Sequence, residues 1–482
     1  MVIYALLLAL ALLLLLGRRR GLPPGPWGLP VLGYLPWIDP KAPHLTLAGL
    51  ARRYGPTFSL SLGRVCAVVL TDPRSIRTLL AREGATGRAP LYVTHGIMHG
   101  YGLICAEGAR WKDQRKFVHN WLRTIGGTKL GTQRRLMERL ILQHAQELVQ
   151  HIDTVLNGAV DPLAALRHHL GSLVNQLVFG RRYPREDPQW AWLQQLQEEG
   201  CKLIGVAGPL NFLPFLRFLP TFRRTMTFLL EGQQQSHLHY QALANQMDAS
   251  LPHSAAPLPS LLEHFLRQRR LSPHHAFRCD RQMHHLLADI FGASLDTTLA
   301  TLRWFLLYVG LDQPLQRRLR ADIGAAVGQR APSLDDAAAL PLLQACVAET
   351  QRIRSVLPLG VPHGALEELE VDGFRVPRGS LVLLLQWAVH MDPARHAHPE
   401  TFEPRRFLDA EGRFRTGPDF LPFQTGKRMC VGDELARQIM FLFLASLLQN
   451  FRVEVVGEVD LEGVAGITLS PRPYQVVFRR GP

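Results

Sequence analysis

The spacing of apolar residues changes along the chain and predicts helices in its middle and strands near both ends. Within residues 57–71, FSLSLG alternates apolar and polar side chains and CAVVLT contains β-branched residues, as strands do. Apolar residues then recur at mostly helical spacing from 72 to about 245, broken by turns, and again up to 353 after a Pro- and Ser-rich loop at 249–260. Residues 371–385 read as a hairpin, and 434–451 as a last long helix. The pattern therefore predicts a mainly α fold with a small β region.

The N-terminus differs from the rest because residues 1–16 are apolar without a break. As a helix this run would reach about 24 Å, close to the thickness of the thinner endoplasmic reticulum bilayer. Its cations, Arg18 to Arg20, follow the run instead of preceding it, which favours a retained signal-anchor over a cleaved signal. The positive-inside rule then leaves the remaining chain on the cytosolic face. We expect a single-pass anchor over 1–20, a stiff Pro/Gly-rich hinge over 21–33 and one globular domain over 34–482.

Composition and charge narrow the classes of protein without choosing one. Lysine and arginine number 54 against 40 aspartates and glutamates, so the net charge is +14. This excess suits an acidic partner, an anionic membrane or nucleic acid. No basic run or nucleic-acid module supports the last, so nucleic acid is not expected. The six cysteines include no Cys-x-x-Cys pair, which excludes a zinc ribbon and favours a reducing compartment.

Clustered histidines at 274–275 and 284–285, with Cys279 between them, could suggest a zinc site. Their spacing matches no standard zinc motif. We therefore expect these histidines to lie on the surface or in loops.

Cys430 stands in an unusual setting, the stretch FQTGKRMCVG, directly before the last helix. Near the positive end of a helix a thiol has a lowered pKa and is stabilised as thiolate. Gly426 and Gly432 would let a flat, bulky ligand approach the backbone, and Arg428 can pair with an anion. These features together predict a thiolate bound to a metal inside a large anionic cofactor. Taken alone, however, a single cysteine is more often a small buried residue.

The whole pattern, Phe423, Gly426, Arg428, Cys430 and Gly432, resembles the haem-binding signature of the cytochrome P-450 superfamily, the haem-thiolate monooxygenases. The resemblance implies that Cys430 is the axial ligand of the iron in haem b and that the other four residues also bind the cofactor. It also implies the fold of that family, in which the haem lies between a long oxygen-activation helix and the cysteine loop.

Further motifs follow in the family's order. Glu349 and Arg352 share a helix face, and with Arg406 of PRRF they resemble the family's buried ion network. Trp111 and Arg115 resemble the pair that holds the haem propionates, again on one helix face. His363 would add a further propionate contact by the same resemblance.

The stretch DIFGASLDTT resembles the oxygen-activation segment, with Asp296 as catalytic acid and Thr297 as catalytic alcohol. A helical threonine can donate to the carbonyl four residues back, here that of Ala293, which would open the turn for a small ligand. Ser294 stands where many relatives have glycine, so the groove for oxygen could differ in shape and in polarity.

The resemblance implies a monooxygenase that receives electrons from NADPH through a separate flavoprotein reductase, because no flavin or nicotinamide motif is visible. Cytochrome b5 is a further implied electron donor. Residues 87–108 and 423–437 are similar to arthropod microsomal steroid hydroxylases of ecdysteroid synthesis. They imply a lipophilic substrate, an ecdysteroid precursor hydroxylated at C25 of its side chain. The candidate pocket segments are mostly apolar: Ala89–Cys105, Ala293–Thr297, Val356–Val361 and Gly466–Thr468.

Other activities stay open at this point. An apolar pocket would also suit a fatty acid or a foreign lipophile. A haem-thiolate isomerase would keep Cys430 and need no reductase, although the acid and alcohol at 296–297 argue against it. A membrane-bound haem sensor would bind a ligand without turnover.

Overall fold

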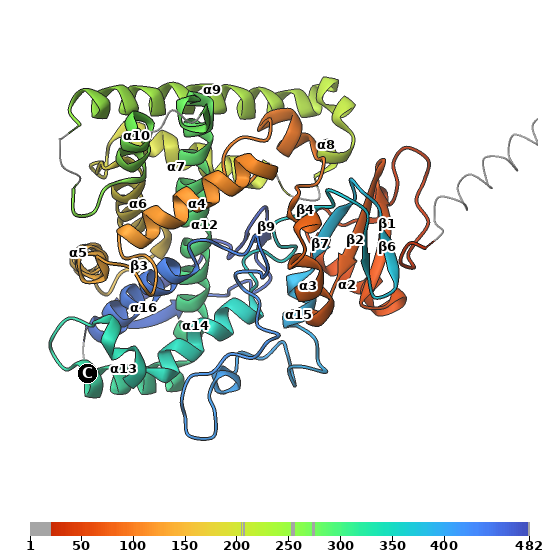
Figure 1. The fold of residues 1–482 in the computed structure, drawn as a ribbon. Helices are drawn as coiled ribbons and strands as arrows, with labels where there is room; N and C mark the ends of the chain where they lie inside the picture. Colours follow the sequence, from red (N-terminus) through yellow and green to blue (C-terminus); the bar gives the residue numbers. More distant parts are fainter. Residues whose placement is uncertain (1–20, 204, 206–207, 252–255, 272–274, 481–482) are drawn as a thin grey trace, which may run out of the picture.

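The computed structural model describes residues 21–203, 205, 208–251, 256–271 and 275–480. Helices make up most of this part, and the strands within residues 57–70 and 363–384 lie at one side of it (Figure 1), so the predicted mainly α fold with a small β region is confirmed. None of the helices in these ranges combines the length and hydropathy needed to cross a bilayer. The anchor expected over 1–20 lies outside the described residues.

The α-helices, in chain order, are α2 (Pro43–Tyr54), α3 (Pro73–Leu80), α4 (Gly108–Thr124), α5 (Arg134–Asp153), α6 (Pro162–Phe179), α7 (Pro188–Leu203), α8 (Pro209–Phe212), α9 (Pro220–Ala249), α10 (Leu261–Leu271), α11 (His275–Arg278), α12 (Asp280–Leu311), α13 (Gln313–Val327), α14 (Pro341–Ile353), α15 (Gln386–His390) and α16 (Asp433–Asn450). Short 3-10 turns include η6 (Pro404–Phe407), and Tyr92–Ile97 forms a π-helical turn. The loop expected at 249–260 does separate α9 from α10, and α16 matches the predicted last helix.

The strands are β1 (Thr57–Leu62), β2 (Val65–Leu70), β3 (Ala159–Val160), β4 (His363–Gly364), β5 (Leu369–Val371), β6 (Phe374–Val376), β7 (Leu381–Leu384), β8 (Arg452–Val456), β9 (Val464–Ala465), β10 (Leu469–Ser470) and β11 (Gln475–Arg479). The largest sheet has the order β1-β2-β7-β4, and a second has the order β3-β11-β8. The strand pair predicted over 57–71 is β1 and β2, which pair antiparallel from Thr57 opposite Leu70 to Leu62 opposite Val65.

The hairpin expected over 371–385 is only half correct. β5 and β6 do pair around Asp372 and Gly373, but β7 joins another sheet. It lies parallel to β2, with Val68 opposite Val382, and antiparallel to β4. All four residues of β7 are buried. This continuous apolar strand therefore lies inside the sheet, between β2 and β4, and does not pair with β6, the strand that precedes it in the sequence.

The Pro-rich segment 24–33 is packed against β1. The Ser59 N–H donates to Pro24 O (2.8 Å), and the Tyr34 N–H donates to Ser61 O (2.6 Å). A Cβ on Gly25 would collide with Ser59 O, so only glycine lets the backbones approach here. The stiff hinge was expected over 21–33, and in the structure the parts of this segment near Pro24 and near Gly33 are both bonded to the first two strands of the sheet or the turn between them.

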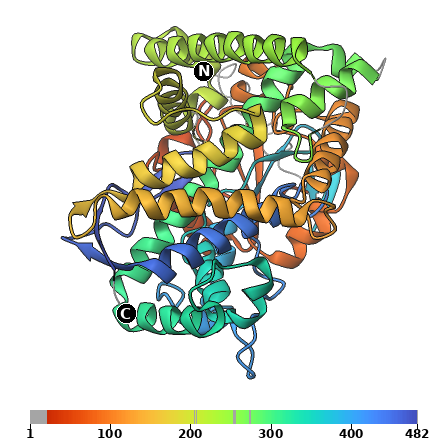
Figure 2. The same cartoon turned by 90° about the vertical axis from the view of Figure 1, so that its left-hand side faces the viewer.

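Helix α12 runs through the centre of the helical part and packs against most of the other long helices. It extends from α9 at one end to α13 at the other, and Figure 2 shows these two helices at opposite ends of the molecule. Residues 298–310 are buried on every side, as expected for a helix at the centre of a core. It packs against α6, α14 and α16, which share its hydrophobic cluster.

The histidines on α12 contradict the expectation of a surface position. His284 and His285 are buried, and His237 of α9 lies against both rings, with centroids 5.0 and 4.7 Å away. Packing of α9 on α12 covers them, which local composition could not indicate. Within the described ranges no group of histidine, cysteine or acidic side chains has the arrangement of a metal site.

Candidate active site

A largely apolar cavity lies between α12 and the loop that precedes α16. Three of the four predicted pocket segments contribute to it, through Leu103 and Ile104, through Ala293, Ser294 and Thr297, and through Val356, Leu357 and Val361. The fourth, Gly466–Thr468, is not among the lining residues and forms the tight turn between β9 and β10. Aliphatic side chains of α6 and α16 complete the wall.

The cysteine loop is held in shape by its own backbone and by its neighbours. The Cys430 N–H donates to Phe423 O (2.9 Å), which closes the loop, and the Lys427 N–H donates to Leu80 O (3.2 Å). Gly426 has a φ of 77°, and a Cβ there would collide with Leu80 O. Gly432 caps the start of α16. Phe423 and Cys430 both line the cavity, so the thiol has its accessible surface there.

The predicted position of Cys430 at a helix start is correct, but the predicted direction of its pKa is wrong. Burial raises the pKa of the Cys430 thiol above its usual value, and the Asp433 carboxylate raises it further. The Gly432 N–H and the Arg115 guanidinium lower it without offsetting the burial. The surrounding protein therefore favours the neutral thiol, and a metal cation on the sulfur would be what makes it a thiolate.

Three arginines converge on one side of the cavity. Arg428 donates to Ile104 O (3.1 Å) and Ala106 O, and Arg88 donates to Ile104 O (2.6 Å) and Pro362 O (2.9 Å). Arg115 donates to Met429 O (2.8 Å), and Trp111 lies under Arg428, whose guanidinium carbon is 4.6 Å from the ring centroid. Burial and then Arg88 lower the pKa of Arg428 to about 8. Like charges held this close favour an anion between them.

His363 lies behind these arginines and outside the cavity lining. Its Nδ1 is 3.0 Å from Ala85 O, and its Nε2 is 3.4 Å from Gln424 Oε1. Burial, and then Arg88, lower the pKa of His363 to about 3, so the ring is neutral. The sequence placed this histidine among the anion-binding residues, and the structure brings it to the edge of that group.

On the opposite wall, α12 is helical throughout its predicted oxygen-activation segment. Thr297 Oγ1 donates to Ala293 O (2.7 Å), the hydrogen bond that the sequence spacing suggested. Ser294 also lines the cavity. Asp296 is not among the lining residues, and its Oδ2 accepts a hydrogen bond from Gln197 Nε2 (2.9 Å) on α7. The structure thus brings Thr297 to the cavity but turns Asp296 away from it.

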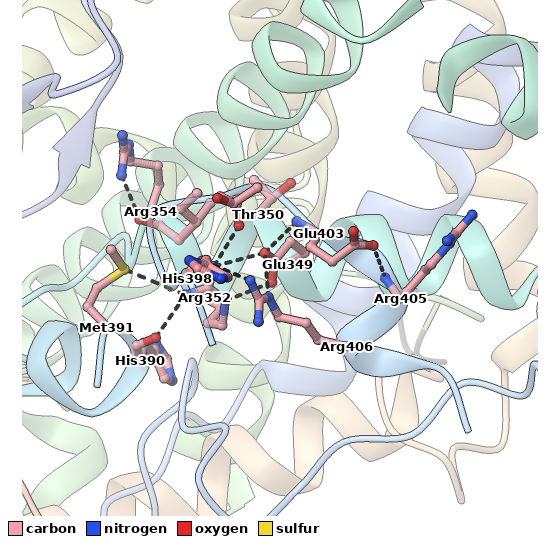
Figure 3. Close-up of polar contacts among 12 residues, drawn as sticks. Glu349, Thr350, Arg352, Arg354, His390, Met391, His398, Glu403, Arg405 and Arg406 are labelled. Atoms are coloured by element: carbon pink, nitrogen blue, oxygen red, sulfur yellow. Dashed lines mark hydrogen bonds and ion pairs between the residues drawn. The ribbon is translucent and has the colours of Figure 1, made fainter. Parts of the chain in front are cut away.

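The ion network lies apart from the cavity, and Figure 3 shows its members converging from α14 and η6. Arg352 donates from Nε and Nη2 to both Glu349 oxygens (2.7 and 2.8 Å), and both side chains are completely buried. Arg406 Nε is 3.5 Å from Glu349 Oε1. Arg352 also donates to His390 O (2.9 Å), and His390 Nε2 accepts from the Leu421 N–H (2.9 Å). The network is therefore linked to the cysteine loop.

Two buried residues of the site were missed in the sequence. Arg88 carries no pattern beyond its place in an apolar stretch. Asp289 Oδ2 accepts the N–H groups of Leu103 (2.6 Å) and Ile104 (2.8 Å), although burial raises its pKa to about 6. Asp289 starts the DIFGASLDTT stretch, and a carboxylate on an apolar helix was the only signal that could have indicated it.

Comparison with known proteins agrees with this geometry. The family model described as Cytochrome P450 matches residues 23–478. The chain belongs to the cytochrome P450 family. It is 43% identical to Cytochrome P450 306a1 of Drosophila melanogaster, over 95% of this chain and 89% of that protein. It is 32% identical to Cytochrome P450 18a1 of the same fly (96% and 88%) and 30% identical to human Cytochrome P450 2U1 (96% and 90%).

Membership of the cytochrome P450 family implies a monooxygenase with a haem-thiolate iron, a reductase that supplies electrons and a small-molecule substrate. The residues around the cavity fit a haem. Cys430 offers a sulfur ligand, three arginines offer partners for two carboxylates, and apolar side chains flank the space between them. Arg428 Nε is buried without a hydrogen-bond partner in the described chain, which an anionic cofactor would provide.

Proposed function

We propose that this cytochrome P450 hydroxylates a steroid, an ecdysteroid precursor, at C25 of its side chain. The observation that carries the proposal is the similarity of residues 87–108 and 423–437 to the ecdysteroid C25-hydroxylase Phantom. The identity of 43% to Cytochrome P450 306a1 along nearly the whole chain supports a close relationship. The apolar lining of the cavity supports a substrate with a large apolar body.

The proximal residues would hold the cofactor by distinct interactions. Cys430 would ligate the iron, with Phe423, Gly426 and Gly432 giving the flat ring room at the loop. A propionate would pair with Arg428 and the other with Arg115 and Trp111, and Arg88 would join them. The bound haem supplies the oxygen-activating chemistry, with thiolate electron density favouring O–O cleavage.

The distal residues would deliver protons and exclude water. Thr297 lines the cavity and its hydroxyl donates to Ala293 O, so its oxygen would be available to accept or relay a proton. Asp296 would supply protons to it after turning from its present partner. The aliphatic wall keeps bulk water from the reacting C–H bond.

The proposed surroundings follow from the anchor and the charge. Residues 1–20 would fix the protein in the endoplasmic reticulum membrane with its catalytic domain, 34–482, on the cytosolic face. Residues 21–33, which are bonded to the sheet, would connect the two. The basic excess suits docking of an acidic flavoprotein reductase that takes electrons from NADPH, and of cytochrome b5.

The test is turnover in membranes with an NADPH-dependent reductase and the ecdysteroid precursor that lacks the 25-hydroxyl group. We expect one added oxygen in the product mass and NMR assignment of the new hydroxyl to C25. A hydroxyl at another carbon, or no product from protein that shows the thiolate spectrum with carbon monoxide, would refute the assigned reaction. In that case fatty acids and foreign lipophiles are the next substrates to assay.

The same assay separates the isomerase alternative. An isomerase would convert its substrate without NADPH, whereas the proposed reaction consumes NADPH and oxygen in proportion to product. Product formed without reductase would therefore contradict the proposal.

A further inference from the structure

A surface pocket with a volume of about 880 Å³ lies where α5, α13 and the end of α16 meet. Among the described residues it shares no lining residue with the cavity beside Cys430, because the first turns of α16 line that cavity and its last turn lines this pocket. The volume lies within the roughly 300–1,000 Å³ of small-molecule sites. The pocket is therefore large enough for a metabolite and separate from the site of oxygen chemistry.

The pocket is strongly basic. Of the described residues that line it, five are arginines and one, Asp153, is acidic. The arginines come from separate parts of the chain, namely Arg317 and Arg320 of α13, Arg330 of the loop that follows α13, Arg452 of β8, and Arg480. The fold thus brings together positive charges that are far apart in the sequence.

Carboxylates balance only part of this charge. Three of them each pair with one lining arginine: Asp153 with Arg480, Asp336 with Arg330, and Glu454 with Arg452. The five lining arginines exceed these three carboxylates by two. Burial and then the Arg452 guanidinium lower the pKa of Arg320, so like charges stand close together here. An anion between them would relieve their repulsion.

The pocket also contains a buried hydroxyl group without a partner. Ser446 of α16 lines the pocket and is 4% exposed, and its Oγ has no hydrogen-bond partner among the described residues. A buried polar atom is normally paired by protein, ligand or water, so this hydroxyl points to a bound group. Side-chain amides complete the polar lining: Gln146, Gln150, Gln313, Gln316, Gln329, Gln449 and Asn450.

The side chains favour phosphate as the anion. An arginine guanidinium donates two parallel hydrogen bonds to two oxygens of one phosphate, and several arginines match a compound with more than one phosphate. The amides and the hydroxyl can bond the uncharged part of such a compound. The chemistry of the lining is therefore that of a site for an organic phosphate.

The place of the pocket favours a soluble compound over a lipid headgroup. Residues 24–33, which the proposed anchor would bring next to the membrane, are bonded to β1. Figure 1 shows β1 on the opposite side of the molecule from α5 and α13. A membrane at β1 would therefore not reach the pocket.

We propose that this pocket binds a soluble small molecule that carries two or more phosphates, with Arg317 and Arg320 pairing with phosphate oxygens and Ser446 donating to the ligand. The inference does not depend on the C25 assignment, because the pocket and the cavity beside Cys430 are separate. A ligand bound to the end of α16 should also stabilise the folded protein, since it binds the folded state alone.

The test is isothermal titration calorimetry of the haem-loaded full chain in detergent with adenosine diphosphate and with inorganic pyrophosphate. We expect one site per chain for each probe. Arg317→Gln should weaken both by roughly tenfold, because it removes a charge-assisted hydrogen bond. Arg318→Gln is the matched control, since Arg318 is an exposed arginine of the same helix outside the pocket lining. No binding with about 1 mM probe, or an equal loss in both variants, would overturn the proposal.

Ser446→Ala separates a ligand contact from a structural role. An unpaired buried hydroxyl does not stabilise the ligand-free protein, so the urea midpoint without probe should stay the same or rise. Pyrophosphate should bind about fivefold more weakly, because one hydrogen bond is lost. A lowered midpoint with unchanged binding would overturn the proposal.

Two further comparisons identify the ligand class and its source. Adenosine monophosphate, with one phosphate, should bind at least about fivefold more weakly than the diphosphate, and equal affinities would refute a site for two phosphates. The diphosphate titration is repeated in phosphatidylcholine nanodiscs with and without phosphatidylinositol 4,5-bisphosphate. Equal affinities in the two discs support a soluble ligand, whereas competition by the lipid would overturn that source.

The haem spectrum, recorded during the same titration, locates the probe. We expect no change in the Soret band, because the pocket and the cavity beside Cys430 share no lining residue among those described. A spectral shift that follows the binding curve would place the probe beside the haem and overturn the proposal. None of these measurements requires the steroid, so their failure would leave the C25 assignment untouched.

Discussion

Removing the carboxylate of Glu349 should destabilise this cytochrome P450 severely. The two Glu349 oxygens accept hydrogen bonds from Arg352 and from the Glu403 N–H (2.8 Å), and Arg406 lies 3.5 Å away. In Glu349→Ala, Arg352 would keep its charge with no exposed surface and no carboxylate partner. The backbone bonds from Arg352 to His390 O and Thr401 O remain, so the position of the arginine would survive but its charge would be unbalanced.

The expected loss follows from that burial. Breaking one partner of a buried ion pair costs about 3–5 kcal/mol, which is a large share of the roughly 5–15 kcal/mol that stabilises a folded domain. Glu411→Ala is the matched control. Glu411 pairs with Arg413 at 2.7 Å, but both side chains are 64% exposed, and exposed pairs contribute little.

The assay is urea unfolding followed by tryptophan fluorescence, together with the half-life of the thiolate spectrum with carbon monoxide at one elevated temperature. The half-life is included because large proteins often unfold irreversibly. We expect a much lower urea midpoint and a shorter half-life for Glu349→Ala, and parent values for Glu411→Ala. If both variants changed equally little, the buried network would contribute no more than a surface pair and the reasoning would be refuted.

Three other changes test the site and its pH dependence. Cys430→Ser should abolish the thiolate spectrum with carbon monoxide; an unchanged spectrum would exclude Cys430 as the iron ligand. Thr297→Ala should raise peroxide release and lower product per NADPH by up to about a hundredfold, the low end of a general acid–base contribution; equal coupling in variant and parent would remove Thr297 from the proton path. Burial and Arg352 lower the pKa of His390 to about 3 in the folded protein. In the unfolded chain its pKa is near 6.5, so the unfolded state binds the proton first as the pH falls. The free energy of unfolding therefore decreases as the pH drops below about 6.5. In His390→Gln, the decrease in the free energy of unfolding between pH 7 and pH 5 should be about 2 kcal/mol smaller than in the parent. The measurement is urea unfolding of both proteins at the two pH values, and an equal decrease in parent and variant would show the assignment to be wrong.

The elements and residues that the sequence predicted share one property, which is that their signal is local. Strands β1 and β2 and helix α16 follow from the spacing of neighbouring residues. The motif around Cys430 occupies ten positions and could be compared as a unit. Glu349 and Arg406 are 57 positions apart, and only their order among other motifs suggested that they meet.

What the sequence did not predict depends on contacts between distant segments. β7 pairs with β2 and β4 and not with β6, its neighbour in sequence. Helix α9 covers His284 and His285, which were expected at the surface. The pKa of Cys430 was assigned from nearby charges, while burial, which needs the whole fold, determines its direction. Gln197 and Arg88 have no motif at all, and their positions are known only from what lies opposite them.

The attachment of the first described residues also limits how the globule could move on a membrane. The Arg375 N–H donates to Gly21 O (2.7 Å), and Ser59 bonds Pro23 O (2.6 Å) and Pro24 O (2.8 Å). With an anchor over 1–20, as proposed, no flexible linker would separate the anchor from the globular domain, because Gly21, the residue that follows the anchor, is already bonded to a strand of the domain. The globular domain would then keep a fixed orientation relative to the membrane, with the exposed Trp27 and Val31 close to the lipid surface, and would not rotate freely about a linker.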